Sequence, residues 1–271
     1  MKLELKHLCF LAKVSRSGYY DWSGRPFRKM SLDEKAVVKL FRLKKEKVGY
    51  RTIKMLFERK FKRRINVKKV RRIKRDFKLV TRIRRKSKFR MINIEGQEHK
   101  AVPNLVNRNF EDSNLILVDI TEMKIMGGQK SYIFAMKNAL TREIVGHAVS
   151  ANPSVKLVTE TVETFLKAAT TRYVIHSDQG VHFTCGDYRN LIRKADAIQS
   201  MSRKGNCLDN APIESFFGHM KDEVDYKSCR SVNELRRKLN SYVEYYNYER
   251  PQWGLERKTP AEARVQLSLV Y

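Results

Sequence analysis

Short apolar runs alternate with amphipathic stretches across residues 113–202, and this pattern restricts the fold more than any other feature of the chain. The first three apolar runs follow one another through short links, which favours an antiparallel meander. Amphipathic helices are expected at 155–169 and 187–194. The order β-β-β-α-β-α-β predicts an α/β fold with helices packed around a mixed sheet. The expected strands cover residues 115–121, 131–137, 144–150, 173–177 and 197–202.

Three carboxylates lie where two of these strands and a later helix could bring them together. Asp119 lies in the first strand, and Asp178 directly follows the fourth. Glu214 lies in a helical segment that Asn210 is expected to open, with Pro212 in its first turn. Taken singly, each carboxylate would more often be a solvated surface residue. Together they predict a site for hard divalent cations, which prefer oxygen ligands and can act in pairs in phosphoryl transfer.

The residues around these carboxylates form a recognisable pattern. The motifs SRSGYY, VGYRTIKMLF, HSDQG, SRKGNCLDNAPIESFFGHMKDE and YNYERPQWGLERKTPAEA closely resemble the second-frame transposases of bacterial insertion sequences of the IS-three type. The resemblance covers about residues 8–265. It implies a ribonuclease H-like integrase core with a D-D-E metal triad, which falls on Asp119, Asp178 and Glu214. The chain departs from the family at Asn138, where Asp is frequent, and at residues 181–183, where S-Q-Y is frequent.

The resemblance also implies the cofactor. It indicates two Mg²⁺ ions per site, with Mn²⁺ able to substitute, held by the three triad carboxylates. Glu122 and Asp209 are alternative carboxylates, but their family counterparts are not metal ligands.

Further residues near the triad are candidates for contact with DNA. Lys221 lies seven positions after Glu214, about two helical turns, and is expected to contact a phosphate beside the scissile bond. The alternative for Lys221 is a surface ion pair with Glu214 or Asp222. His176 is expected on the same side of its strand as Asp178, where it could orient substrate or ligand, or simply be packed. The loop before the Glu214 helix is expected to hold the DNA terminus through Arg203, Lys204 and Asn206.

Charge is divided unevenly along the chain. Residues 1–112 hold 35 Lys and Arg against 11 Asp and Glu, whereas the remaining residues hold 22 against 18. A basic half joined to a nearly neutral half indicates a polyanion-binding module, and DNA is the favoured polyanion. A membrane-surface segment would need a broad apolar face, which this region lacks.

The basic half has the pattern of a helix-turn-helix. Ser31 and Glu34 match a capping box that opens a helix up to about residue 47. A second helix is expected at 52–60, and a third after Asn66, with apolar residues at intervals of three and four. We expect this third helix to contact DNA phosphates, although a solvated basic face is the alternative. Its basic residues are Lys68, Lys69, Arg71, Arg72, Lys74 and Arg75.

These patterns predict five segments and exclude several classes of protein. No apolar run approaches the roughly 18 residues of a membrane span, and the N-terminus does not resemble a signal peptide. A cytoplasmic protein is therefore expected, and the resemblance implies a bacterial, nucleoid-associated one. The four cysteines lack C-x-x-C spacing, so reduced thiols are expected rather than zinc sites or disulfides. The expected segments are a short helical N-terminal segment at 1–30 (with a turn at Ser15–Gly18), a basic helix-turn-helix-like domain at 31–90, a connector at 91–112, the catalytic core at 113–225 and a helical extension of the core at 226–271.

The sequence therefore predicts a DNA transposase subunit that cleaves and joins insertion-sequence ends. Its expected partners are double-stranded DNA and further copies of itself on DNA. The resemblance also implies a first-frame transposase protein as partner, fused by frameshifting or acting alongside. Two alternatives remain: a metal-dependent nuclease without strand transfer, and a non-catalytic DNA-binding remnant of a decayed element. Trp253 is expected to pack in a turn, with stacking on a DNA end as the alternative reading.

Overall fold

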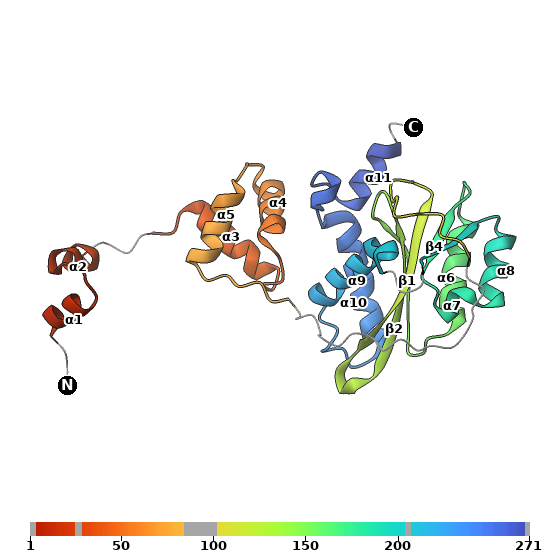
Figure 1. Ribbon diagram of the computed structural model, residues 1–271, viewed down its shortest axis with the longest axis horizontal. Helices are drawn as coiled ribbons and strands as arrows, with labels where there is room; N and C mark the ends of the chain where they lie inside the picture. Colours follow the sequence, from red (N-terminus) through yellow and green to blue (C-terminus); the bar gives the residue numbers. More distant parts are fainter. Residues whose placement is uncertain (1–3, 25–28, 84–101, 204–206, 269–271) are drawn as a thin grey trace.

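The computed structural model describes residues 4–24, 29–83, 102–203 and 207–268, and a five-stranded mixed sheet forms its centre (Figure 1). The sheet has the strand order β3-β2-β1-β4-β5. The first three strands form an antiparallel meander, and β4 and β5 add in parallel beside β1. Both the meander and the mixed sheet expected from the sequence are confirmed. The strands are β1 (Leu115–Lys124), β2 (Lys130–Asn138), β3 (Ile144–Ser150), β4 (Val174–Ser177) and β5 (Ile198–Met201).

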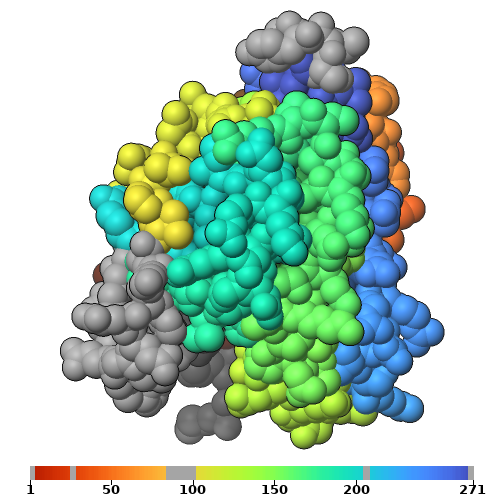
Figure 2. Space-filling view, turned by 90° about the vertical axis from the view of Figure 1, so that its right-hand side faces the viewer, coloured from red at the N-terminus to blue at the C-terminus, as the bar shows by residue number. Residues whose placement is uncertain are grey.

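Helices cover both faces of the sheet. Because successive side chains of a strand point to opposite faces, β1 contributes to two separate hydrophobic clusters. Ile116 and Val118 pack with α6 and α8, whereas Leu115 and Leu117 pack with α9 and α10. Figure 2 shows the first of these layers from outside, with α6 and α8 side by side. The covering helices are α6 (Val155–Lys167), α7 (Val181–Thr184) and α8 (Gly186–Lys194) on one face, and α9 (Ala211–Glu223) and α10 (Val232–Glu244) on the other.

The short helix α7 occupies the segment where the sequence departs from the S-Q-Y of the family. Phe183 is fully buried there, with its ring centroid 6.4 Å from that of Phe134 and 5.5 Å from that of Tyr188. His182 contacts the carbonyl of Pro153 through Nε2 at 3.1 Å. The departure therefore supplies a packed aromatic side chain to the core.

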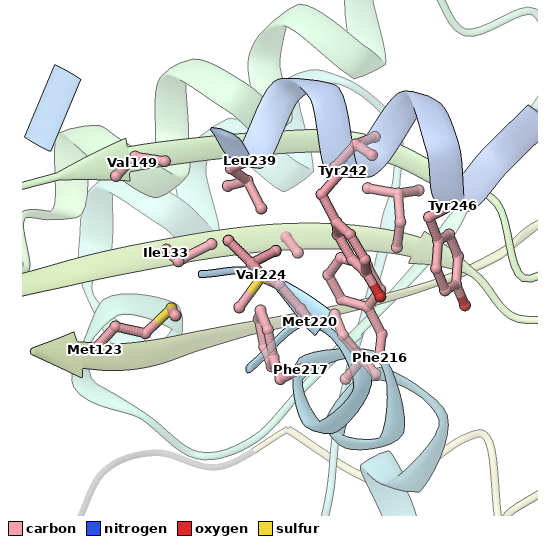
Figure 3. Close-up of a cluster of buried hydrophobic side chains, with 14 of the residues drawn as sticks. Met123, Ile133, Val149, Phe216, Phe217, Met220, Val224, Leu239, Tyr242 and Tyr246 are labelled. Carbon is pink, nitrogen blue, oxygen red and sulfur yellow. The ribbon is translucent and has the colours of Figure 1, made fainter. Parts of the chain in front are cut away.

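The packing of α9 fixes the helix that carries Glu214. Phe216 and Met220 of α9 are buried against Leu239 and Tyr242 of α10 and against the sheet (Figure 3). Burying an aromatic or aliphatic side chain of this size contributes about 1.5–3 kcal/mol. The chain after α10 continues as a π-helical turn (Tyr245–Glu249), a 3₁₀ turn η4 (Trp253–Leu255) and α11 (Pro260–Ser268).

The N-terminal region is helical, as expected. Helices α3 (Leu32–Leu43), α4 (Tyr50–Phe61) and α5 (Val67–Asp76) enclose a hydrophobic cluster of their own. The capping box of Ser31 and Glu34 is confirmed, and the side chain of Asn66 caps α5 by accepting from Lys68 N at 2.8 Å. Helix α3 ends before residue 47, because Lys45 and Glu46 take positive φ angles of 50° and 61°.

The expected turn at Ser15–Gly18 is wrong. Helices α1 (Leu5–Leu11) and α2 (Arg16–Ser23) are joined earlier, around Lys13, which has a φ of 52°. Ser15 is the N-cap of α2, and its hydroxyl accepts from Gly18 N at 3.0 Å. Both residues therefore begin the helix rather than the turn.

No helix in the described part of the chain is long and apolar enough to cross a membrane. Half of the expected connector at 91–112 lies outside the described residues, and residues 102–112 form no helix or strand.

Candidate active site

The topology brings the three predicted carboxylates to one face of the sheet. Leu117 of β1 pairs with His176 of β4. Asp119 lies two residues further along β1, and Asp178 directly follows the end of β4, so the two carboxylates lie at the same edge of the paired strands. Asp119 shares the face of Leu115 and Leu117, which α9 covers. Glu214 lies in the first turn of α9.

Electrostatic coupling indicates how close these carboxylates are. Partial burial raises the pKa of Asp119 to about 7, with further contributions from the charges of Asp178 and Glu214. Burial and the charge of Asp178 raise the pKa of Glu214, and burial raises the pKa of Asp178, although its side chain is solvent-exposed by area. Because the charge of Asp178 raises the pKa of both Asp119 and Glu214, all three side chains lie within electrostatic reach of one another. Binding of a cation would relieve this repulsion.

Local backbone contacts orient two of the carboxylates. Oδ1 of Asp119 accepts from Ile120 N at 2.7 Å, and Oδ1 of Asp178 accepts from Gly180 N at 2.9 Å. A Cβ atom at residue 180 would lie 2.8 Å from Oδ1 of Asp178, so only glycine permits this close approach.

The three carboxylates are oxygen ligands of the kind that hard cations bind, but their side chains do not form a complete coordination shell. Within the four described stretches, no group of three or more His, Cys, Asp or Glu side chains is assembled tightly enough to hold a metal ion. Three carboxylates with raised pKa values nevertheless supply the oxygen ligands and negative charge that Mg²⁺ and Mn²⁺ prefer.

Two buried polar residues attach the start of α9 to the sheet, and sequence reasoning missed both roles. Asn210 opens α9 as its N-cap residue with Pro212 in the first turn, as expected, but its side chain makes no capping hydrogen bond. Its Nδ2 instead donates to Val118 O on β1 at 3.3 Å. Lys137 of β2 is only 3% exposed, and its Nζ donates to Pro212 O at 2.7 Å. Burial lowers the pKa of Lys137 to about 7. The sequence signal for the role of Lys137 was a lysine at an inward-facing position of a predicted strand.

His176 lies within the packed sheet rather than on a substrate surface. It is fully buried, with Nδ1 2.9 Å from Ser200 Oγ and Nε2 3.0 Å from Ser202 Oγ. Burial lowers its pKa. The ring links β4 to β5 and its neighbouring loop, so direct contact with a substrate, one of its two expected roles, does not fit this position.

The alternative carboxylates are engaged elsewhere. Glu122 has an ion pair with Lys130 at 3.2 Å. Asp209 is buried, and Arg203 holds it with two hydrogen bonds of 2.9 and 3.0 Å, while Arg108 adds a third at 2.9 Å. These partners lower the pKa of Asp209 far below its usual range.

The expected DNA contacts fall into three groups. Lys221 donates to Thr121 Oγ1, and its charge lowers the pKa of Asp119, so it lies beside the triad. Arg203 is bound to Asp209 but still has 56% of its side chain exposed. Lys204 and Asn206 lie outside the described residues.

The six basic residues of α5 do not all face solvent. Nζ of Lys69 forms an ion pair with Asp33 at 2.5 Å. Lys74 lies 4.4 Å from the ring centroid of Phe41 and donates to Thr81 Oγ1 at 2.6 Å. The four residues with exposed side chains are Lys68, Arg71, Arg72 and Arg75.

Comparison with known proteins identifies the family. Residues 113–207 and 196–260 each match an integrase core domain. The chain is 30% identical over 239 residues to the putative transposase InsK of insertion sequence IS150 from Escherichia coli K12, covering 86% of this chain and 83% of that protein. An uncharacterised transposase-like protein of Haemophilus influenzae is 34% identical over 212 residues, covering 75% and 94%.

Two further similarities are more distant. The transposase InsF of IS3A from E. coli K12 is 25% identical over 267 residues, covering 93% of this chain and 91% of that protein. The catalytic core domain of BIV integrase is 17% identical, with a TM-score of 0.43, covering 59% of this chain and 98% of that structure. Together with the motifs and the sheet order, the sequence matches show that this chain belongs to the insertion-sequence transposases that carry an integrase core domain, the IS3-type transposases among them.

Proposed function

We propose that this transposase cleaves and joins insertion-sequence ends at a D-D-E site made by Asp119, Asp178 and Glu214. The supporting observation is that three carboxylates from a strand, a strand end and a helix lie on one face of the sheet, where the charge of Asp178 raises the pKa of both Asp119 and Glu214. Such a cluster is unfavourable by itself, so its charge calls for a cationic ligand.

The three side chains would hold two divalent ions, Mg²⁺ or Mn²⁺. When bound, such ions neutralise charge on the phosphate and stabilise the attacking and leaving oxygens. A water molecule or a DNA 3′-hydroxyl is then the nucleophile, so no covalent protein intermediate is needed. Asp119 and Asp178 hold their side chains in place through the backbone contacts of Ile120 and Gly180. Glu214 is carried by the buried face of α9.

Basic residues around the site and on α5 would bind the DNA. Lys221 lies next to Asp119 and is suited to contact a phosphate beside the reacting bond. The four exposed basic residues of α5 are suited to contact the phosphates of duplex DNA, as in a helix-turn-helix. A first-frame protein and further copies of this chain complete the proposed assembly.

The geometry of Asn138 bears on the alternative of a decayed element. Its Nδ2 donates to Ser113 O at 2.6 Å, and its Oδ1 accepts from Leu140 N at 3.1 Å and Thr141 N at 2.9 Å. These hydrogen bonds hold the turn after β2. The departure from the family at this position therefore has a structural explanation that does not involve the triad.

The test compares triad variants with a matched carboxylate on the same strand. Asp119→Asn, Asp178→Asn and Glu214→Gln each keep the side-chain size but weaken metal coordination. Glu122→Gln is the control, because Glu122 lies on β1 but is paired with Lys130. Mn²⁺ binding by calorimetry and single-turnover cleavage and joining of terminal-repeat DNA should both fall by orders of magnitude in the triad variants and stay near wild type in the control.

Double variants should lose little more than single variants, because residues that act as a unit are non-additive. Near-normal joining by Glu214→Gln would assign Glu214 a structural role. Cleavage without joining in the wild-type chain, with and without a first-frame protein, would favour the nuclease alternative.

A further inference from the structure

A basic groove runs beside α9, apart from the triad carboxylates. It has a volume of about 960 Å³ and lies between α4, the turn after β2, the start of α9 and the C-terminal segment around Trp253. Its basic side chains outnumber its carboxylates by five to one, which favours an anionic occupant. The cations are Arg51, Arg108, Lys137, Arg142 and Arg250, and the carboxylate is Glu111.

Three of these cations are bound to other parts of the protein. Arg250 is buried and pairs with Glu223 at 2.7 Å. Lys137 donates to the backbone of α9, and Arg108 pairs with Asp209. These contacts build the wall of the groove and leave the recognition of a ligand to other residues.

Arg142 is the side chain best placed to bind that ligand. Among the described residues it has no hydrogen-bond or ion-pair partner, although it is half-buried. Its guanidinium packs against Gly254, where an added Cβ atom would lie 2.5 Å from Nη1. Its charge also helps to lower the pKa of Lys137. A half-buried guanidinium without a carboxylate is suited to a phosphate oxygen.

Trp253 adds an aromatic surface to the same groove. Its side chain is 42% exposed, and the guanidinium carbons of Arg51 and Arg257 lie 5.4 and 5.3 Å from its ring centroid. Arg257 also approaches Glu58 at 3.5 Å, whereas Arg51 has no ion-pair partner in the described ranges. A planar base that displaced Arg51 from the ring would stack on Trp253 and leave Arg51 free to bind a neighbouring phosphate.

We propose that this groove binds an unpaired segment of DNA strand next to the reacting end, with phosphates on Arg142 and Arg51 and one base on Trp253. The volume is that of a pocket for a small ligand and suits a few nucleotides of one strand rather than a duplex. Pro212 and Ser215 of α9 line the groove on either side of Glu214 in the sequence. A strand held there would lead towards the triad, and in this respect the proposal rests on the proposed function.

The two tryptophans of the chain allow a direct test of stacking. Trp22→Phe leaves Trp253 as the fluorophore, and Trp253→Phe leaves Trp22, which is 67% exposed on α2. The full-length protein is titrated with a short oligothymidylate. We expect the oligothymidylate to quench the tryptophan fluorescence of Trp22→Phe strongly and that of Trp253→Phe only slightly. Loss of one stacked base in Trp253→Ala should weaken binding about 5- to 150-fold.

Charge variants test the phosphate contact. Arg142→Gln should reduce the slope of log affinity against log salt by about 0.7 for the single strand. Lys156→Gln is the control, because Lys156 is exposed on α6, on the opposite face of the sheet. Arg142→Lys retains the charge and should recover most of the affinity. Thermal unfolding of each variant identifies any loss that comes from disruption of the turn at Gly254.

Equal quenching of both tryptophans, or an unchanged salt slope in a folded Arg142→Gln, would overturn the proposal. Competition by an acidic peptide of the same charge and at the same concentration would also overturn the proposal, because the occupant would then be a protein. The oligothymidylate titration is repeated on Asp119→Asn. Unchanged strand binding with lost joining separates the groove from the triad, so failure of either proposal can be recognised without the other.

Discussion

Replacing Asp119 by Asn should stabilise the metal-free protein, and the gain should depend on pH. The pKa of Asp119 rises from 3.8 to about 7 in the folded chain. The folded chain therefore holds this proton more tightly than the unfolded chain. The resulting stability is present in full below about pH 4 and is lost as pH rises through about 7. Asparagine has no such dependence.

The size of this pH-dependent change in unfolding free energy follows from the part of the pKa shift that lies between pH values at which unfolding can be measured. About 2 pKa units lie between pH 5 and 7, or about 3 kcal/mol at roughly 1.4 kcal/mol per unit. Solvent screening of a partly exposed group reduces this to about 1–2 kcal/mol. The free energy of unfolding of Asp119→Asn, minus that of wild type, should therefore increase by about this amount from pH 5 to pH 8. The pH slope is unaffected by any constant cost of losing the hydrogen bond from Ile120.

The assay is urea unfolding of the full chain in EDTA, followed by circular dichroism at several pH values. Glu122→Gln serves as the control for loss of a carboxylate from the same strand. Adding Mg²⁺ at pH 8 should stabilise wild type and not Asp119→Asn, because a ligand that binds only the folded state raises its stability. If the difference in unfolding free energy between Asp119→Asn and wild type does not depend on pH, then burial and the charge of Asp178 do not destabilise the ionised form of Asp119.

Three further outcomes follow from the same contacts. Replacing Lys68, Arg71, Arg72 and Arg75 together by alanine should reduce the salt slope of duplex binding by up to about 0.9 per lost phosphate contact, measured by fluorescence anisotropy. An unchanged slope would indicate that these four side chains of α5 face solvent and do not contact DNA phosphates. Lys221→Ala should keep Mn²⁺ affinity and lose joining, since misplacement of about 1 Å can cost about a hundredfold; lost Mn²⁺ binding would contradict this role. Asn210→Ala should lower single-turnover joining and keep duplex binding, and normal joining would show that the contact with Val118 is dispensable.

The strands, and the places of Asp119 and Asp178 relative to them, could be predicted because their signals are local. Apolar runs such as 115–121 and 173–177 have a length and composition typical of buried strands, and the strand period of two indicates which side chains share a face. The residue after a strand end is also visible in sequence, which is how Asp178 was found. The turn at Ser15–Gly18 failed for the converse reason, because Ser and Gly serve equally in turns and at helix starts.

The orientation of side chains on α5 could not be read from charge. All six basic residues look alike in the sequence, yet Lys69 meets Asp33, 36 residues away, and Lys74 lies over Phe41. Both contacts depend on how α5 packs against α3. A stripe of cations on a helix therefore indicates how many charges are available, and only the packing shows which of them face solvent.

The position of Glu214 relative to the sheet depends on contacts that a sequence pattern does not show. Its helix is attached to β1 by Asn210 across 92 residues and to β2 by Lys137 across 75 residues. Neither partner is visible to a local pattern, since each depends on which strand the helix reaches after folding. Both contacts are buried, so losing either would leave an unsatisfied polar group at a cost of about 1–3 kcal/mol. The distance between Glu214 and the two aspartates is consequently set by residues that are not themselves candidates for metal binding.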